Sequence, residues 1–198
     1  MNKKWFPWAI VGGVLLLVIM IFIGSYNGLV SDREKVTTSF SKVQTQYQRR
    51  ADLIPNLVST VKGASNFEQS TLVQVTEARA KATSITIDPS KATPADVQKF
   101  MDAQNGVTSS LSKLLAVAES YPQLTATQTY QDLMNQLEGT ENRIQVARSD
   151  YNDVARPYNT RIQTFPTNIF AGMFGFTSRP YFEAAAGSET VPTVNFGN

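Results

Sequence analysis

The sequence predicts an all-α protein in which an N-terminal transmembrane helix is followed by an antiparallel, kinked four-helix bundle with an extended C-terminal tail. Residues 5–23 form an uncharged apolar run, and beyond it apolar residues recur at helical spacings of three and four. No stretch shows the apolar–polar alternation of a half-buried strand. The predicted organisation is a membrane anchor over residues 1–28, a helical bundle over 29–166, and an apolar membrane-proximal segment with an extended tail over 167–198.

The length of the apolar run indicates a membrane span. As a helix it would rise roughly 28 Å, close to the hydrocarbon thickness of about 30 Å. A cleaved secretory signal is the alternative, but its apolar region is usually ~7 to 15 residues and ends at a small-x-small site. Here residues 24–27 read Gly-Ser-Tyr-Asn, so we expect an uncleaved single span. Lys3 and Lys4 directly precede it and favour a cytoplasmic N-terminus, which places the bundle on the extracytoplasmic side of the plasma (inner) membrane.

Apolar spacing and capping signals define the four bundle helices. A Ser65-x-x-Glu68 pattern and Thr93 before Pro94 are typical of helix starts, as is the segment 125–128. The helices are expected over residues 36–61, from about 66 to 82, over 94–121, and after the cap at Thr125 up to 162.

Two prolines fall inside these helices. Pro55 lies in the first and Pro157 in the fourth, and each removes a backbone donor and crowds the preceding turn. We therefore expect bends near Ala51 and Asp153.

Composition removes many chemistries. The chain has no Cys and no His, which excludes thiolate or imidazole metal sites, Cys-His and Ser-His-Asp nucleophiles, and disulfides. Beyond the anchor, basic and acidic residues balance, so we expect no nucleic-acid partner. The sequence predicts no catalytic, cofactor-binding or metal-binding residues.

Several polar sequence motifs interrupt the apolar stripes. In chain order they include Tyr26-Asn27-x-Leu29-Val30, residues 49–58 (RRADLIPNLV), 118–122 (AESYP), 137–144 (LEGTENRI), Ala147-Arg148-x-x-Tyr151-Asn152, Tyr158-Asn159-x-Arg161-Ile162, Phe174-Gly175-Phe176 and Pro180-Tyr181-Phe182. Together they resemble the LemA family over nearly the whole chain. The resemblance implies a bacterial, single-pass membrane protein with an antiparallel helical bundle. It brings no catalytic set, because the family has no established molecular function.

The polar motifs of the first and fourth helices should lie opposite each other. Arg50 occupies a seam position and needs a carboxylate partner if it is buried, for which Asp52, Glu138 and Glu141 are the candidates. Asn56 and Asn142 are expected to satisfy backbone groups freed by the proline at 55. The predicted cluster comprises Arg49, Arg50, Asp52, Asn56, Glu138, Glu141, Asn142 and Arg143. The favoured interpretation is a register-fixing internal network, and the alternative is a ligand or partner site.

The topology returns the fourth helix to the membrane, where an apolar segment follows. Residues 169–176 are too few to span a bilayer, so Phe170, Phe174 and Phe176 either lie against lipid or cover the open end of the bundle. We favour the covering role slightly, because three aromatics can close a core without a large exposed patch. The tail from Tyr181 is expected to be extended, and either to pack on the bundle or to dock elsewhere.

We therefore expect a non-enzymatic interaction or scaffold module at the bacterial membrane. Its predicted partners are the lipid bilayer and a membrane or envelope protein, and self-association is a further expectation. Two alternatives remain open: a ligand-binding or enzymatic bundle that uses the Arg/Asp/Glu/Asn cluster, and membrane remodelling by the Phe-rich segment. No cofactor is expected.

Overall fold

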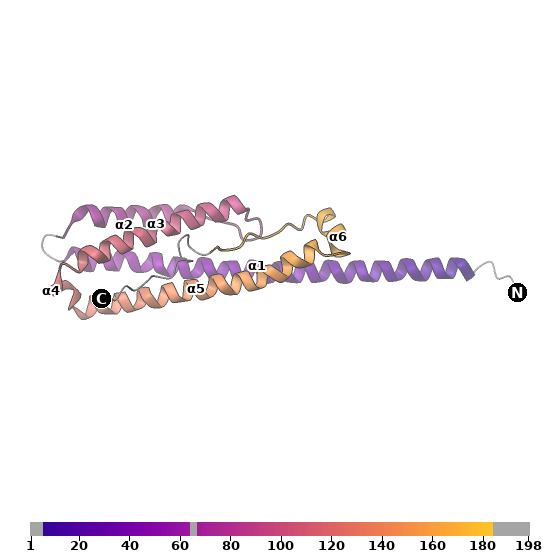
Figure 1. The fold of residues 1–198 in the computed structure, drawn as a ribbon, viewed down its shortest axis with the longest axis horizontal. Helices are drawn as coiled ribbons and strands as arrows, with labels where there is room; N and C mark the ends of the chain where they lie inside the picture. Colours follow the sequence, from indigo (N-terminus) through magenta and orange to yellow (C-terminus); the bar gives the residue numbers. More distant parts are fainter. Residues whose placement is uncertain (1–5, 64–66, 184–198) are drawn as a thin grey trace, which may run out of the picture.

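One helix carries the chain from the apolar run into the bundle. The computed structural model describes residues 6–63 and 67–183, and its first helix, α1 (Phe6–Lys62), is 57 residues long. Figure 1 shows the N-terminal part of α1 projecting well beyond the other helices. Side chains are almost all exposed up to Ile23, and a buried stripe begins at Leu29. The apolar run and the bundle core therefore belong to one continuous helix.

The other elements are helices as well, and the described ranges contain no strand. They are α2 (Gln69–Ser84), α3 (Pro94–Ala118), α4 (Pro122–Thr125), α5 (Gln128–Gln163) and α6 (Thr167–Met173). The helix α1 packs chiefly against α5, while α2 packs against α3 and α1 (Figure 1). The predicted all-α fold with an N-terminal apolar helix is confirmed, and α1 and α5 are the longest elements.

Two apolar clusters make up the core. The proximal cluster, nearer the apolar run, includes Leu29, Val36, Phe40, Val43, Tyr47, Phe100, Ile144, Tyr151, Tyr158 and Ile162. The distal cluster includes Ile54, Leu57, Val61, Leu72, Val75, Val107, Leu111, Leu114, Leu124 and Leu137. On α1 the boundary between them falls between Tyr47 and Ile54, which is the turn that holds Arg50.

Helix starts follow the predicted caps in part. Thr93 caps α3, as predicted, and it also forms a reciprocal capping box with Asp96. The predicted cap at Thr125 is wrong: α4 occupies that residue, and the hydroxyl of Thr127 accepts from the Tyr130 N–H to cap α5. The predicted cap at Ser65 lies outside the described residues, and α2 begins at Gln69.

Both helices continue through their internal prolines. Pro55 and Pro157 are exposed, so their rings face solvent rather than the core. Because neither helix ends there, the bends near Ala51 and Asp153 stay predictions.

After α6 the chain reverses and returns along the bundle. Gly175 makes the turn with a φ of 71°, which glycine adopts without steric cost, and the Phe176 N–H donates to the Ala171 carbonyl at 2.9 Å. Residues 177–183 then run back without helix beside the long helices (Figure 1). This part of the predicted tail packs on the bundle, and residues 184–198 lie outside the described residues.

Candidate functional site

A buried arginine lies between the two core clusters. Arg50 is only 2% exposed. Its Nη1 donates to Glu141 Oε1 on α5 at 2.6 Å and to Thr108 Oγ1 on α3 at 2.9 Å. Its Nη2 donates to Gln104 on α3, to the side-chain Oε1 at 2.6 Å and to the backbone carbonyl at 3.1 Å. One guanidinium therefore joins three helices.

This polar layer ties α1 to α3 and α5. A charge removed from water is costly unless its hydrogen bonds are made. Four donors of Arg50 have acceptors here, and the guanidinium also lies 5.1 Å from the Tyr47 ring centroid. Sliding α1 by one turn would move this charge among the apolar side chains of either cluster. The favoured interpretation of the cluster as an internal network therefore fits its buried half.

The other predicted members lie at the surface. Arg49, Asp52, Asn56, Glu138, Asn142 and Arg143 are exposed. Of the three carboxylates proposed for Arg50, Glu141 is the partner, whereas Asp52 accepts from Gln48 Nε2 at 2.8 Å. The cluster thus divides into a buried arginine with its half-exposed partner Glu141, and an exposed set.

The predicted role of Asn56 and Asn142 is wrong. Proline at position 55 leaves the Ala51 carbonyl without its helical donor, and this carbonyl accepts from Arg79 Nε on α2 at 2.7 Å. Asn56 on α1 and Asn142 on α5 are both exposed, and neither side chain bonds to a described residue. Sequence reasoning missed Arg79, Gln104 and Thr108, whose partners are distant in the chain.

Three of the six exposed members line a groove between α1 and α5. Arg49, Asp52 and Arg143 line it, with Leu53, Asn135, Gln136, Gly139 and Thr140. The groove encloses about 490 Å³ and carries two guanidinium groups and one carboxylate. Its hydrogen-bonding side chains carry charges of both signs and can contact a polar surface.

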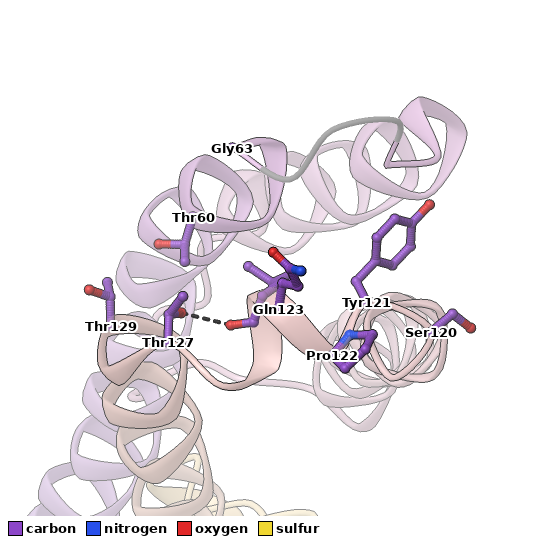
Figure 2. Close-up of a pocket in the computed structure, with 9 residues that line it drawn as sticks. Thr60, Gly63, Ser120, Tyr121, Pro122, Gln123, Thr127 and Thr129 are labelled. Carbon is purple, nitrogen blue, oxygen red and sulfur yellow. Dashed lines mark hydrogen bonds between the residues drawn. The ribbon is translucent and has the colours of Figure 1, made fainter.

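A second groove lies at the end of the bundle opposite the apolar run. It forms where the end of α1 meets the α3–α5 connection, and Thr60, Ser120, Tyr121, Gln123 and Thr129 are among its lining residues (Figure 2). Its volume is about 710 Å³. Thr127, also in the lining, donates from Oγ1 to the Leu124 carbonyl at 2.7 Å, which holds α4 against the start of α5. Hydroxyl and amide groups predominate, so this groove too has the character of a binding surface.

A repeated Tyr-Asn pair on α5 holds the returning segment. Asn159 donates to the Arg179 carbonyl and accepts from the Arg179 N–H, both at 2.8 Å. Asn152 does the same at Phe182, at 2.8 and 2.9 Å. Seven helical residues and three extended residues both cover about 10 Å, so the two amides match the segment in register.

The tyrosines of these pairs add two further bonds. Tyr158 donates to the Thr177 carbonyl at 3.1 Å and Tyr151 to the Pro180 carbonyl at 2.8 Å. Burial raises the pKa of Tyr158, and it raises the pKa of Tyr151 to about 12. Sequence reasoning did not find this clamp, although the seven-residue repeat of Tyr-Asn was a visible signal.

The predicted aromatic segment has two faces. Phe176 is buried, Phe170 is half-buried, and Phe174 is 44% exposed. The covering role we favoured therefore describes only the inner side of the segment, since Ile169 and Met173 face outward.

These features describe a helical-bundle protein whose first helix is a candidate membrane span. The described part of α1 contains one segment long and apolar enough to cross a bilayer, and none of that segment is buried. Within the described ranges, no cluster of His, Cys, Asp and Glu could hold a metal ion.

The comparisons with known proteins agree with this class. The LemA family matches residues 39–196, and the chain belongs to this family. It is 27% identical to Protein LemA of Metamycoplasma hominis over 165 residues, which cover 83% of this chain and 72% of that protein. It is also similar to Magnetosome protein MamQ 2 of Paramagnetospirillum magneticum, at 26% identity over 89% of this chain and 73% of the relative. Magnetosome protein MamQ of Magnetospirillum gryphiswaldense is 24% identical over 89% of this chain and 71% of the relative.

Proposed function

We propose that this protein is a non-enzymatic interaction module that presents binding surfaces at a fixed distance from a bacterial membrane. The observation that carries the proposal is the continuity of α1, which leads from an exposed apolar run into the buried core without a break. A continuous helix of this kind fixes the distance between the membrane and each surface of the bundle. The span crosses the plasma membrane once, and the bundle lies on the extracytoplasmic side.

The state of the polar cluster supports recognition rather than catalysis. Buried Arg50 uses four of its five N–H donors on Glu141, Thr108 and Gln104 of the neighbouring helices. Such groups stabilise a fold but are not free to bind or transform a ligand. This arrangement weakens the alternative of a ligand-binding or enzymatic site built on the cluster.

The groove between α1 and α5 is the surface best suited to a protein partner. Arg49 and Arg143 lie on its two sides and Asp52 adds a carboxylate, so it can form charged hydrogen bonds with a complementary helix or loop. We propose a membrane or envelope protein as the partner, with a second copy of the chain as another occupant.

Photocrosslinking in cells tests this function. A photoreactive amino acid replaces Arg49 or Arg143 in the full-length chain, and the matched control replaces Ser112, an exposed residue of α3. The proposal predicts one shared crosslinked protein from both groove positions and none from position 112. Failure of both groove positions in a correctly folded, membrane-bound chain would contradict it. Equal capture from all three positions would also contradict it, because the contact would then not be specific to the groove.

A further inference from the structure

The helix α6 lies beside the last turns of the apolar run. The Phe22 ring on α1 is 4.7 Å from the Phe170 ring and 5.4 Å from the Phe174 ring, measured between centroids. Tyr26, one turn later, lies 5.2 Å from Phe174. These edge-on contacts fix α6 at the level of residues 22–26 of α1, where Figure 1 shows it alongside the long helix.

One face of this short helix is apolar and unpartnered. Thr167 and Ala171 face inward and are buried. On the outer side, Ile169 is 52% exposed and Met173 is 74% exposed, and Phe165 just before the helix is 75% exposed. The inner contacts are thus complete while three large apolar side chains remain outside.

The charged residues nearest α6 mark the boundary between the hydrocarbon and water. On α1 no charged residue occurs between Lys4 and Asp32, and in the α5–α6 region none occurs between Arg161 and Arg179. The first charges above these two uncharged stretches meet: Arg161 Nη1 donates to Asp32 Oδ2 at 2.9 Å. Gly28 makes room for this pair, since a Cβ there would lie 2.3 Å from Arg161 Nη2.

The depth of α6 follows from these positions. A helix that enters the hydrocarbon near Trp8 covers about 30 Å only by residue 28, at ~1.5 Å per residue. An entry point nearer residue 5 moves the far boundary to about residue 25. In either case the level of residues 22–26 falls at the edge of the hydrocarbon, below the Asp32–Arg161 pair.

We propose that α6 is a second membrane-contacting element, which lies in the lipid interface with Phe165, Ile169 and Met173 turned into the acyl chains. The exposed face lies at the level of residues 22–26, where the exposed apolar run of α1 ends, and an uncharged helix at this depth has lipid as its natural neighbour. The inference rests on the proposed membrane span of α1. Together the two contacts set the tilt of the bundle, because a span alone leaves the helix axis able to lean in any direction.

Lipid quenching of single labels tests the proposal on the full-length chain. Since the sequence has no cysteine, Ile169→Cys, Met173→Cys, Leu16→Cys and Val146→Cys each give one labelling site. Each variant carries an environment-sensitive fluorophore and is reconstituted at low protein density in phosphatidylcholine–phosphatidylglycerol vesicles. The quencher is a doxyl group placed either near the headgroup or near the end of the acyl chain. Val146 is the matched control, because it is an apolar α5 residue with 60% exposure that lies well away from α6.

The expected result is quenching at positions 169 and 173 at least about three-fold stronger than at 146, strongest with the shallow doxyl group. Position 16 should be quenched most by the deep group. Quenching at 169 and 173 no stronger than at 146 overturns the proposal, whether water, a second copy or another protein covers the face. If position 16 is also unquenched, the membrane span itself is refuted. If position 16 is quenched, the anchor and the proposed function stand while the role of α6 fails.

Discussion

Arg50 and Glu141 form an ion pair, 2.6 Å between Nη1 and Oε1, at the level where the proximal and distal core clusters meet. The arginine is buried, whereas the carboxylate side chain is 40% exposed. The two partners therefore differ in what their removal leaves behind. Loss of the glutamate leaves a guanidinium charge in the core, and loss of the arginine leaves a carboxylate that water can reach.

The first prediction concerns this asymmetry. Glu141→Ala should lower the free energy of unfolding by about 2–3 kcal/mol, below the ~3–5 kcal/mol for a fully buried pair because Glu141 is partly hydrated. Glu138→Ala, an exposed glutamate one turn earlier on α5, should change it by less than about 0.5 kcal/mol. Denaturant unfolding in detergent micelles measures both. Equal effects of the two variants would show that the pair does not hold the core.

The second prediction concerns the carbonyl of Ala51. Arg79→Met removes its donor and should cost about 1–2 kcal/mol in the natural chain. In a Pro55→Ala background the restored N–H of residue 55 can bond that carbonyl, so the same change should cost about half as much or less. The unfolding free energies of the parent, the two single variants and the double variant measure the coupling between the two positions. No coupling between positions 55 and 79 would mean that Arg79 acts only through packing.

The third prediction concerns the Tyr-Asn clamp. Asn159→Ala leaves the buried N–H and carbonyl of Arg179 without their partners and should cost about 2–4 kcal/mol. Hydrogen exchange should accelerate at the amides of residues 177–183, which the clamp protects. Asn142→Ala, on the same helix but exposed, should leave both quantities unchanged within error. Unaltered exchange in Asn159→Ala would show that other contacts hold the segment.

The fourth prediction concerns alkaline pH. Burial raises the pKa of Tyr151 to about 12 in the folded protein, while an unfolded tyrosine ionises near pH ~10. The folded state therefore keeps the stability contributed by this phenol below pH ~10 and loses it as the pH rises through about 12. Tyr151→Phe should be less stable by about 1 kcal/mol near neutral pH, from the lost bond to the Pro180 carbonyl.

The difference between the parent and Tyr151→Phe should then narrow and reverse in sign between pH ~10 and ~12. Only the parent loses this contribution, and at ~1.4 kcal/mol per pKa unit the loss exceeds the ~1 kcal/mol bond. Unfolding curves collected across that interval provide the measurement. A difference that stays constant to pH ~12 would place the folded pKa of Tyr151 at its ordinary value.

The parts of the fold that sequence analysis predicted share a periodic or local signal. The buried positions of α1, α3 and α5 repeat at three and four residues, and Thr93 with Asp96 forms its cap within four residues of chain. Arg50 was identifiable as a polar residue on an apolar stripe. Its carboxylate could be narrowed to three candidates because antiparallel helices bring known stretches together.

The contacts that were missed join residues far apart and have no period of their own. Arg79 reaches a carbonyl 28 residues earlier, and Gln104 reaches a guanidinium 54 residues away. Thr125 and Thr127 are equally good caps by residue type, and the short helix α4 decided between them. The exposed outer face of α6 depends on which side packs on α1, which composition alone does not specify.

The central claim is that the membrane span and the bundle core are one unbroken helix. Spin labels at Leu16→Cys, within the apolar run, and Arg49→Cys, in the bundle, measure this directly by pulsed electron–electron resonance in lipid bilayers. A continuous helix predicts a single narrow distribution centred near 50 Å, from ~1.5 Å per residue over the intervening stretch. A broad distribution, or a mean well below that value, would mean that α1 breaks between lipid and bundle, and would contradict the account.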